Sequence, residues 1–197
     1  MFILSITTEL TPFLSKAHIN HVIPPDEYAT GDDSVYTNYV ARRNLLFAAE
    51  AAAIVGDSSA DAAHWLNVST AISLLFDQKR GVHWEYEGYT GGKIKQADAV
   101  LLGFPLMLNM SKAVRKADLD YYAPRTDPNG PAMTWGMHAV GYLELHDDDG
   151  EDDGDGGDVI NSNFNRSFAN AQPPFYVWTE VRYRHTAAVL CMDRGTL

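Results

Sequence analysis

The sequence predicts an all-α fold. Apolar residues recur at helical spacing in several segments, and a glycine or proline ends most of these segments. No βαβ alternation and no glycine-rich phosphate loop is present. The chain has 197 residues, 46% of them hydrophobic, which is enough for one domain with a substantial core. We expect β-structure to be limited to a hairpin or two.

The N-terminal half predicts two helices and one extended segment. The first helix is expected from Ser34 to Gly56, where the glycine ends it. The second is expected over residues 57–77, begun by an Asp/Ser cap and carrying Leu74 and Leu75 on its apolar face. Residues 83–89, "HWEYEGY", alternate polar and aromatic side chains and predict a short strand or extended loop.

The C-terminal half predicts four more helices and a final extended segment. The helices are expected over residues 95–106, ended by Gly103 and Pro105; 111–126, with a serine cap and stopped by Pro124; 130–147, with Pro131 near the start and an apolar face through Trp135, Val140 and Leu143; and 160–171. Residues 172–180 are expected to be extended.

Charge and composition exclude several kinds of protein. The net charge of −11 argues against a nucleic-acid partner, which requires a basic surface for phosphates. No stretch is long enough to span a bilayer, so no membrane partner is expected. Much of the negative charge lies in residues 147–158, "DDDGEDDGDGGD". Its spacing is irregular and lacks the closing glutamate of an EF-hand, so we expect a flexible, solvated insertion and no metal.

The cysteine content and the N-terminus bear on the cellular compartment. Cys191 is the only cysteine, which excludes an intrachain disulfide and a multi-cysteine zinc site. The N-terminus begins apolar but lacks the basic region of a signal peptide. We therefore expect a cytoplasmic protein, while a secreted or lysosomal location stays open. No cofactor is expected.

Aromatic rings beside carboxylates in loops are typical of sugar-binding sites. Ring faces pack on pyranose C–H groups, and acids accept hydrogen bonds from hydroxyls. The same aromatics could equally be core residues of a helical scaffold, and both interpretations stay open. The candidates are Trp84, Glu85, Tyr86, Glu87, Tyr89, Trp135, Trp178 and Glu180.

Two glutamates suit glycoside hydrolysis, which requires one protonated and one ionised carboxyl group. In "HVIPPDEY", residues 21–28, Pro24 and Pro25 stiffen the backbone ahead of Glu27, so a fixed backbone could hold its proton at the leaving oxygen. An ordinary proline–carboxylate turn is the commoner explanation of such a stretch. Glu180 follows the apolar "FYVW" and suits the second carboxylate.

Several motifs in fixed order closely resemble glycoside hydrolase family 65: "VIPPDEY", "SVYTN", "EYEGY", "KQADAVLLGFPL", "GPAMTWGMHAVGYLEL" and "NRSFANAQPPFYVWTE". The resemblance covers residues 20–180, and residues 181–197 form an atypical C-terminal tail. It implies an (α/α)6 barrel, of which residues 1–197 would be a single partial catalytic domain, roughly the second half of the toroid. The chain is then a fragment that leaves apolar surface exposed.

The same resemblance implies an inverting cleavage of an α-glucoside. By motif match, Glu27 is the general acid, Glu180 is the general base, and Lys95 and Gln96 hold the glucose. Trp135 and Trp178 are the further substrate-binding candidates. Glu27 and Glu180 are expected to face one another across a pocket, about 6.5–9.5 Å apart, with the acid in the drier surroundings.

Within the family, the motifs look like those of the animal enzymes that release glucose from glucosylgalactosyl-hydroxylysine, so the expected partner is a carbohydrate or glycopeptide. Three further interpretations stay open: a related disaccharide phosphorylase, a trehalase, or an inactive truncated helical fragment. A carboxylate at the position of Glu180 favours hydrolysis, since phosphate needs cationic or hydroxyl donors there.

Overall fold

The chain is rich in helices. The computed structural model describes residues 5–8, 16–29, 31–57, 60–96, 98–146 and 156–178. Its helices in these ranges are α1 (Val35–Val55), α2 (Ala60–Ala71), α3 (Lys112–Tyr122), α4 (Met133–Leu143) and α5 (Gly156–Ser167), with one-turn 3₁₀ helices η1 (Val100–Leu102) and η2 (Ala123–Arg125). None of the helices described there is both long and apolar enough to cross a membrane.

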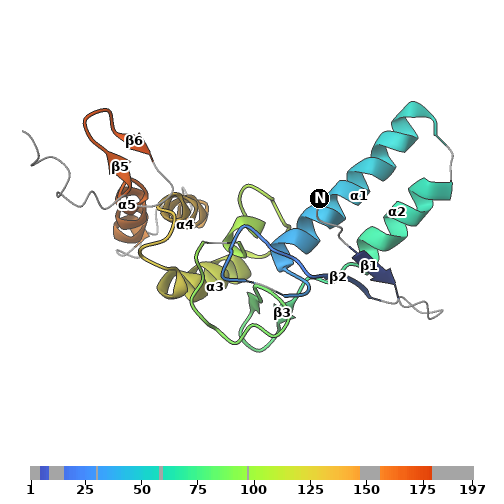
Figure 1. Cartoon of the computed structure of the whole chain (residues 1–197), viewed down its shortest axis with the longest axis horizontal. Helices are drawn as coiled ribbons and strands as arrows, with labels where there is room; N and C mark the ends of the chain where they lie inside the picture. The colour runs from blue at the N-terminus through green and yellow to red at the C-terminus, as the bar shows by residue number, and fades with distance from the viewer. Residues whose placement is uncertain are drawn as a thin grey trace, which may run out of the picture.

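The strands of the described segments form small antiparallel pairs. They are β1 (Ser5–Thr8) with β2 (Ala17–Asn20), β3 (Phe76–Asp77) with β4 (Val82–His83), and β5 (Ala171–Gln172) with β6 (Val177–Trp178). The helical prediction is confirmed, with one more two-stranded pair than expected. In Figure 1, α1 and α2 lie at one end of the molecule, α4, α5 and the β5–β6 hairpin lie at the other, and α3 lies between them.

The first helix forms where local capping predicts it. The Ser34 side chain accepts a hydrogen bond from the backbone N–H of Thr37, and Gly56 ends α1 in the left-handed conformation at φ 75°. A serine oxygen satisfies an N–H group that the first turn leaves unpaired, and glycine takes a positive φ at no steric cost. The predicted limits of α1 are therefore confirmed.

The second helix ends earlier than predicted. It stops at Ala71, and Leu74 and Leu75 lie outside it. Ile72 instead forms a parallel bridge with Ala17, and the Asn38 side chain donates to the carbonyl of Ser73 at 2.9 Å. These tertiary contacts override the helical pattern, and residues 76–77 pair as a strand.

Three predictions in the C-terminal half need correction. The segment 95–106 contains only the 3₁₀ turn η1 among its described residues, although Gly103 ends it as expected. In α4, Leu143 is exposed, and His138 lies on the buried face with Trp135. Helix α5 begins at Gly156, so the last three residues of the acidic insertion expected over 147–158 belong to this helix. Residues 147–155 lie outside the described ranges.

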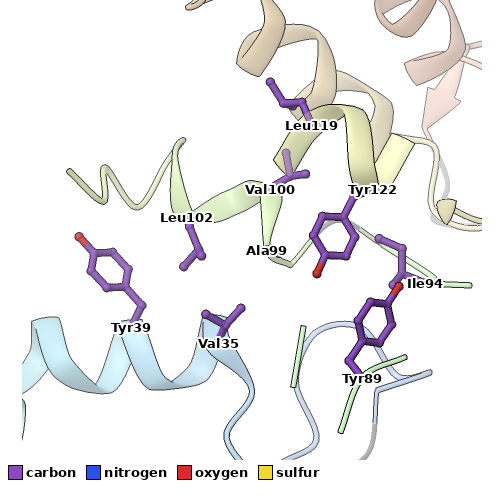
Figure 2. Close-up of a cluster of buried hydrophobic side chains, with 9 residues drawn as sticks. All are labelled: Val35, Tyr39, Tyr89, Ile94, Ala99, Val100, Leu102, Leu119 and Tyr122. Atoms are coloured by element: carbon purple, nitrogen blue, oxygen red, sulfur yellow. The ribbon is translucent and has the colours of Figure 1, made fainter. Parts of the chain in front are cut away.

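The main core joins α1, η1 and α3. Its members are Val35, Tyr39, Tyr89, Ile94, Ala99, Val100, Leu102, Leu119 and Tyr122. Figure 2 shows Val35 and Tyr39 on the side of α1 that faces the segment carrying Leu102, with Tyr122 of α3 near the centre of the cluster. The Tyr122 hydroxyl donates to the carbonyl of His83 at 2.7 Å, which satisfies its buried polar atom. Because Ile94 belongs to this core, the next residue, Lys95, is held at its edge.

Candidate active site

A tight turn carries the predicted general acid. The backbone N–H of Ala29 donates to the carbonyl of Asp26 at 2.9 Å, and the N–H of Tyr28 donates to Asp26 Oδ1 at 3.0 Å. These bonds close the turn after Pro24 and Pro25. Asp26 is fully buried, whereas Glu27 stands at the tip with 66% of its side chain exposed. The turn therefore points one carboxylate into the protein and the next one outward.

Lys95 lies directly against Glu27. Its Nζ is 2.8 Å from Glu27 Oε2, across 68 positions of sequence. The Lys95 side chain is only 13% exposed, so most of it is buried next to the exposed Glu27 carboxylate. The backbone N–H of Lys95 also donates to Asp26 Oδ1 at 3.0 Å, which ties the Lys95 loop to the Pro24–Ala29 turn.

Three buried acids lie beneath this ion pair. The backbone N–H of Asp26 donates to Asp98 Oδ2 at 2.9 Å. Burial raises the pKa of Asp26, and it raises the pKa of Asp98 to about 7. Burial, with the neighbouring charges of Asp98 and Asp26, also places the pKa of Glu85 well above its usual range. Low-dielectric surroundings disfavour the charged form of each acid.

A second polar contact borders the same turn. The Tyr28 hydroxyl donates to Asp127 Oδ2 at 3.1 Å, and the Asp127 N–H donates to the carbonyl of Ile94 at 2.8 Å. The hydrogen bond from the Asn129 N–H is the largest influence that holds the pKa of Asp127 below its usual value. Asp127 is thus an ionised acceptor that links Tyr28 to the Lys95 loop.

Of the remaining predicted site residues, Gln96 lies beside Lys95, Trp135 and Trp178 lie elsewhere, and Glu180 is outside the described ranges. Gln96 follows Lys95 and is half-buried, with its carbonyl accepting from the Asp98 N–H at 3.1 Å. Trp135 is 3% exposed, and the Arg166 guanidinium lies 3.2 Å from the centre of its ring, so that ring face is covered. Glu180 lies outside the described residues.

Trp178 belongs to an aromatic groove at the far end of the molecule. Phe168, Ala171, Tyr176 and Trp178 line an open cavity of about 510 Å³. The Phe168 and Trp178 rings stack at 6.3 Å. The groove involves residues of the β5–β6 hairpin and the end of α5, whereas the blue loop between β2 and α1, which contains Glu27, lies near the middle of the molecule (Figure 1). The structure does not bring Trp178 to Glu27.

The Glu27 side chain is exposed, whereas the acids beside it are buried. The expectation that Glu27 lies in drier surroundings than Glu180 stays a prediction, because Glu180 lies outside the described residues. Glu27 itself is exposed, and the fully buried carboxyl groups nearby are those of Asp26, Glu85 and Asp98. The physical reason is the turn itself, because its hydrogen bonds use the Asp26 side chain and leave the following side chain outside. Asp26, Asp98 and Asp127 were not predicted as parts of this site. Asp26 and Asp98 had one signal, their places within the "PPDEY" and "KQAD" motifs, and Asp127 is in neither motif.

One group of described residues has the spacing of a metal site. Ligand atoms of His18, Asp33 and Glu87 lie within 4.8 Å of one another. His18 Nδ1 is 2.5 Å from Asp33 Oδ2, and Asp33 Oδ1 accepts from the Ile19 N–H and from Asn38 Nδ2 at 3.0 Å. These hydrogen bonds already satisfy the Asp33 carboxylate and join β2 to the start of α1. They give the cluster a structural role.

Comparison with known proteins identifies related sequences. Residues 8–93, which include Glu27, match the glycosyl hydrolase family 65 central catalytic domain. The chain is 47% identical over 165 residues to the protein-glucosylgalactosylhydroxylysine glucosidase of Danio rerio, covering 83% of this chain and 24% of that protein. The Dictyostelium discoideum glucosidase of the same name is 44% identical, covering 82% and 22%.

A bacterial relative has a different stated substrate. A kojibiose hydrolase of Mucilaginibacter mallensis is 36% identical over 167 residues, covering 83% of this chain and 23% of that protein. The chain thus spans about a quarter of the length of the curated relatives that it matches. By its catalytic-domain match and its identity to these hydrolases over most of its length, the chain belongs to glycosyl hydrolase family 65.

Proposed function

We propose that the chain carries the two catalytic carboxyl groups of an inverting α-glucosidase, which releases glucose from glucosylgalactosyl-hydroxylysine of collagen-type glycopeptides. Glu27 is the proposed acid and Glu180 the proposed base. The observation that carries the proposal is the 2.8 Å contact between Glu27 and Lys95, because two segments that resemble family motifs meet at the side chains to which we assign these roles. A carboxyl group beside a largely buried lysine suits a site that binds hydroxyl groups next to a glycosidic oxygen.

In the proposed reaction, Glu27 gives its proton to the glycosidic oxygen as the bond to the sugar carbon breaks. Glu180 takes a proton from a water molecule, whose oxygen attacks the same carbon from the opposite face. The product is β-glucose, and each carboxyl group ends in the other's starting protonation state. Lys95 and Gln96 hold glucose hydroxyls. When a hydroxyl takes the Lys95 ammonium contact, Glu27 is released to carry its proton.

The proposed setting is the second half of an (α/α)6 barrel. Several large apolar side chains on α1 and the C-terminal hairpin are exposed, among them Phe47 at 69%, Ile54 at 85% and Phe175 at 86%. Exposed apolar surface of this kind marks faces that pack against other protein. In our proposal the remainder of a family catalytic domain covers these faces. The same remainder shields Glu27 from solvent. Residues 20–180 are the region of this chain that belongs to the proposed barrel.

The proposed substrate follows the stated substrate of the glucosidases that share 44–47% identity with the chain. A kojibiose hydrolase relative makes an α-linked glucose disaccharide the second candidate. Trehalose hydrolysis and phosphorolysis are further candidate reactions, and an inactive helical fragment is the candidate that turns over no substrate. The reactions differ in their products, because phosphorolysis yields glucose phosphate only when phosphate is present.

The test measures glucose release by the full-length protein from glucosylgalactosyl-hydroxylysine, kojibiose and trehalose, with and without phosphate. Proton NMR of the first product identifies the anomer. We expect β-glucose from the hydroxylysine glycoside, independent of phosphate. α-Glucose would contradict inversion, and release only in the presence of phosphate would favour a phosphorylase. Absence of release from all three substrates would overturn the proposal.

A further inference from the structure

Two buried aspartates connect the loops that carry Glu27 and Lys95. Asp98 Oδ2 accepts the backbone N–H of Asp26 at 2.9 Å, across 72 positions of sequence. Asp26 Oδ1 in turn accepts the N–H groups of Tyr28 and Lys95, each at 3.0 Å. One side of this linkage fixes the residue before Glu27, and the other fixes the Lys95 backbone itself.

The linkage is far drier than the ion pair above it. Asp26 and Asp98 are both 0% exposed, whereas the Glu27 side chain is 66% exposed. Asp26 Oδ2 and Asp98 Oδ1 have no hydrogen-bond partner among the described residues. A buried carboxylate with an unsatisfied oxygen is costly when ionised, so such a pair retains a proton.

We propose that Asp98, through Asp26, is a positioning residue that sets Glu27 opposite Lys95. The importance of Asp98 for catalysis rests on the proposed function. Its role in holding the two loops together rests on the hydrogen bonds alone. The Asp98 oxygen orients the Asp26 N–H, and the Asp26 carboxylate then orients the two backbone groups on either side of the ion pair. An exposed glutamate such as Glu27 would otherwise sample many rotamers, and ordering it requires a fixed backbone.

The charges around Asp98 determine how the linkage responds to pH. Asp26 faces Asp98 from the turn, Glu85 and the Tyr36 hydroxyl add further acidic groups, and Lys95 is the nearby cation for Asp26. Glu27 and Asp118 add the other negative charges. Since burial raises the pKa of Asp98 to about 7, a proton on Asp98 limits the repulsion below neutral pH. Above neutral pH, Asp26 and Asp98 are both charged, and their repulsion weakens the contact between the two loops.

A zero-length cross-link tests this arrangement without requiring activity. A water-soluble carbodiimide activates the Glu27 carboxylate, and the Lys95 amine at 2.8 Å displaces the urea to form an amide. Mass spectrometry measures the yield of the Glu27–Lys95 peptide. The variants are Asp98→Ala, which removes the acceptor, and Asp98→Asn, which keeps an acceptor oxygen but cannot ionise. Asp120→Asn, at an exposed carboxylate on α3, is the matched control.

We expect Asp98→Ala to lower the yield about fivefold, the population change that corresponds to one lost hydrogen bond. Asp98→Asn should restore the yield, and Asp120→Asn should leave it unchanged. The ratio of wild-type to Asp98→Asn yield should fall as the pH rises through about 7, because only the wild type gains a buried charge. Circular dichroism verifies that each variant is folded.

The proposal is overturned if folded Asp98→Ala cross-links as well as the wild type, or if Asp98→Asn fails to restore the yield. A pH-independent ratio would also overturn it. If Asp98→Ala does not fold, the proposal is tested by the cross-link yield of Asp98→Asn and by the pH dependence of its ratio to the wild-type yield. Because the cross-link forms in the absence of substrate, a failure of glucose release leaves these outcomes unaffected.

Discussion

Glu27 Oε2 and Lys95 Nζ lie 2.8 Å apart, and the two residues come from loops separated by α1, α2 and the β3–β4 pair. Among their described residues, the two loops form no strand pair with each other. The loops meet because Asp26 binds the Lys95 backbone and Ile94 is part of the main core. The candidate site therefore depends on buried contacts below it.

Replacing the lysine should weaken substrate binding. In the full-length protein, we expect Lys95→Gln to lower kcat/KM about 10- to 100-fold, mainly through KM, since a hydrogen bond from a charged donor contributes about 1.5–3 kcal/mol. Steady-state kinetics measure the effect. Lys79→Gln, at an exposed lysine between β3 and β4, is the control that should be unaffected. Equal kinetics for Lys95→Gln and wild type would exclude Lys95 from the site.

Gly103 leaves space for a buried arginine. A Cβ at this position would overlap the guanidinium of Arg115, which bonds to Glu144 at the end of α4. We expect Gly103→Ala to lower the free energy of unfolding by about 1–3 kcal/mol, because Arg115 must move and lose that partner. Urea unfolding measures it. Gly92→Ala, where a Cβ meets nothing within 4 Å, is the control, and equal losses in the two variants would contradict this explanation.

Burial of His138 should make the protein less stable in acid. Its side chain is fully buried against Trp135, and burial lowers its pKa to about 4 from an ordinary 6.5. The unfolded chain thus takes up a proton before the folded chain does. Stability from neutral His138 is present above pH 6.5 and is lost as the pH falls toward 4. The difference in unfolding free energy between the wild type and His138→Gln should shrink across this range, and a constant difference would refute it.

Asp98 should have the opposite effect in a similar range. Its pKa rises from 3.8 to about 7 on folding, so the contribution is complete below pH 3.8 and is lost as the pH rises through 7. As the pH rises between these limits, the free energy of unfolding of Asp98→Asn should increase relative to that of the wild type by on the order of a few kcal/mol. Urea unfolding at several pH values measures this gain. A gain that does not grow with pH would show that Asp98 is ionised throughout.

The parts of the fold that local chemistry determines were predictable from the sequence. Ser34 and Gly56 limit α1 through their own capping contacts, and Ser111 caps α3 by accepting from the Val114 N–H. The early end of α2 was not predictable, because it depends on the bridge between Ile72 and Ala17. A contact between residues so far apart in sequence leaves no periodic pattern in either segment.

In the candidate site, too, some residues were predictable from the sequence and others depend on distant contacts. Motif resemblance pointed to Glu27 and Lys95, which the structure brings together. The hydrogen bond from Asp26 to Asp98 could not be predicted, since a side chain bonded to a distant backbone group has no local sequence pattern. The exposure of Glu27 was also missed, because it follows from how the Asp26 side chain is used within the turn.

The central claim is that Glu27 is the proton donor in α-glucoside cleavage. The most direct test measures kcat for glucose release from glucosylgalactosyl-hydroxylysine by the full-length protein and its Glu27→Gln variant. Glu50→Gln, at an exposed position on α1, is the control. We predict that Glu27→Gln lowers kcat by about 10²–10⁴ while KM stays close to that of the wild type, because an amide cannot donate that proton. A Glu27→Gln variant with the kcat of the wild type and of Glu50→Gln would contradict the claim.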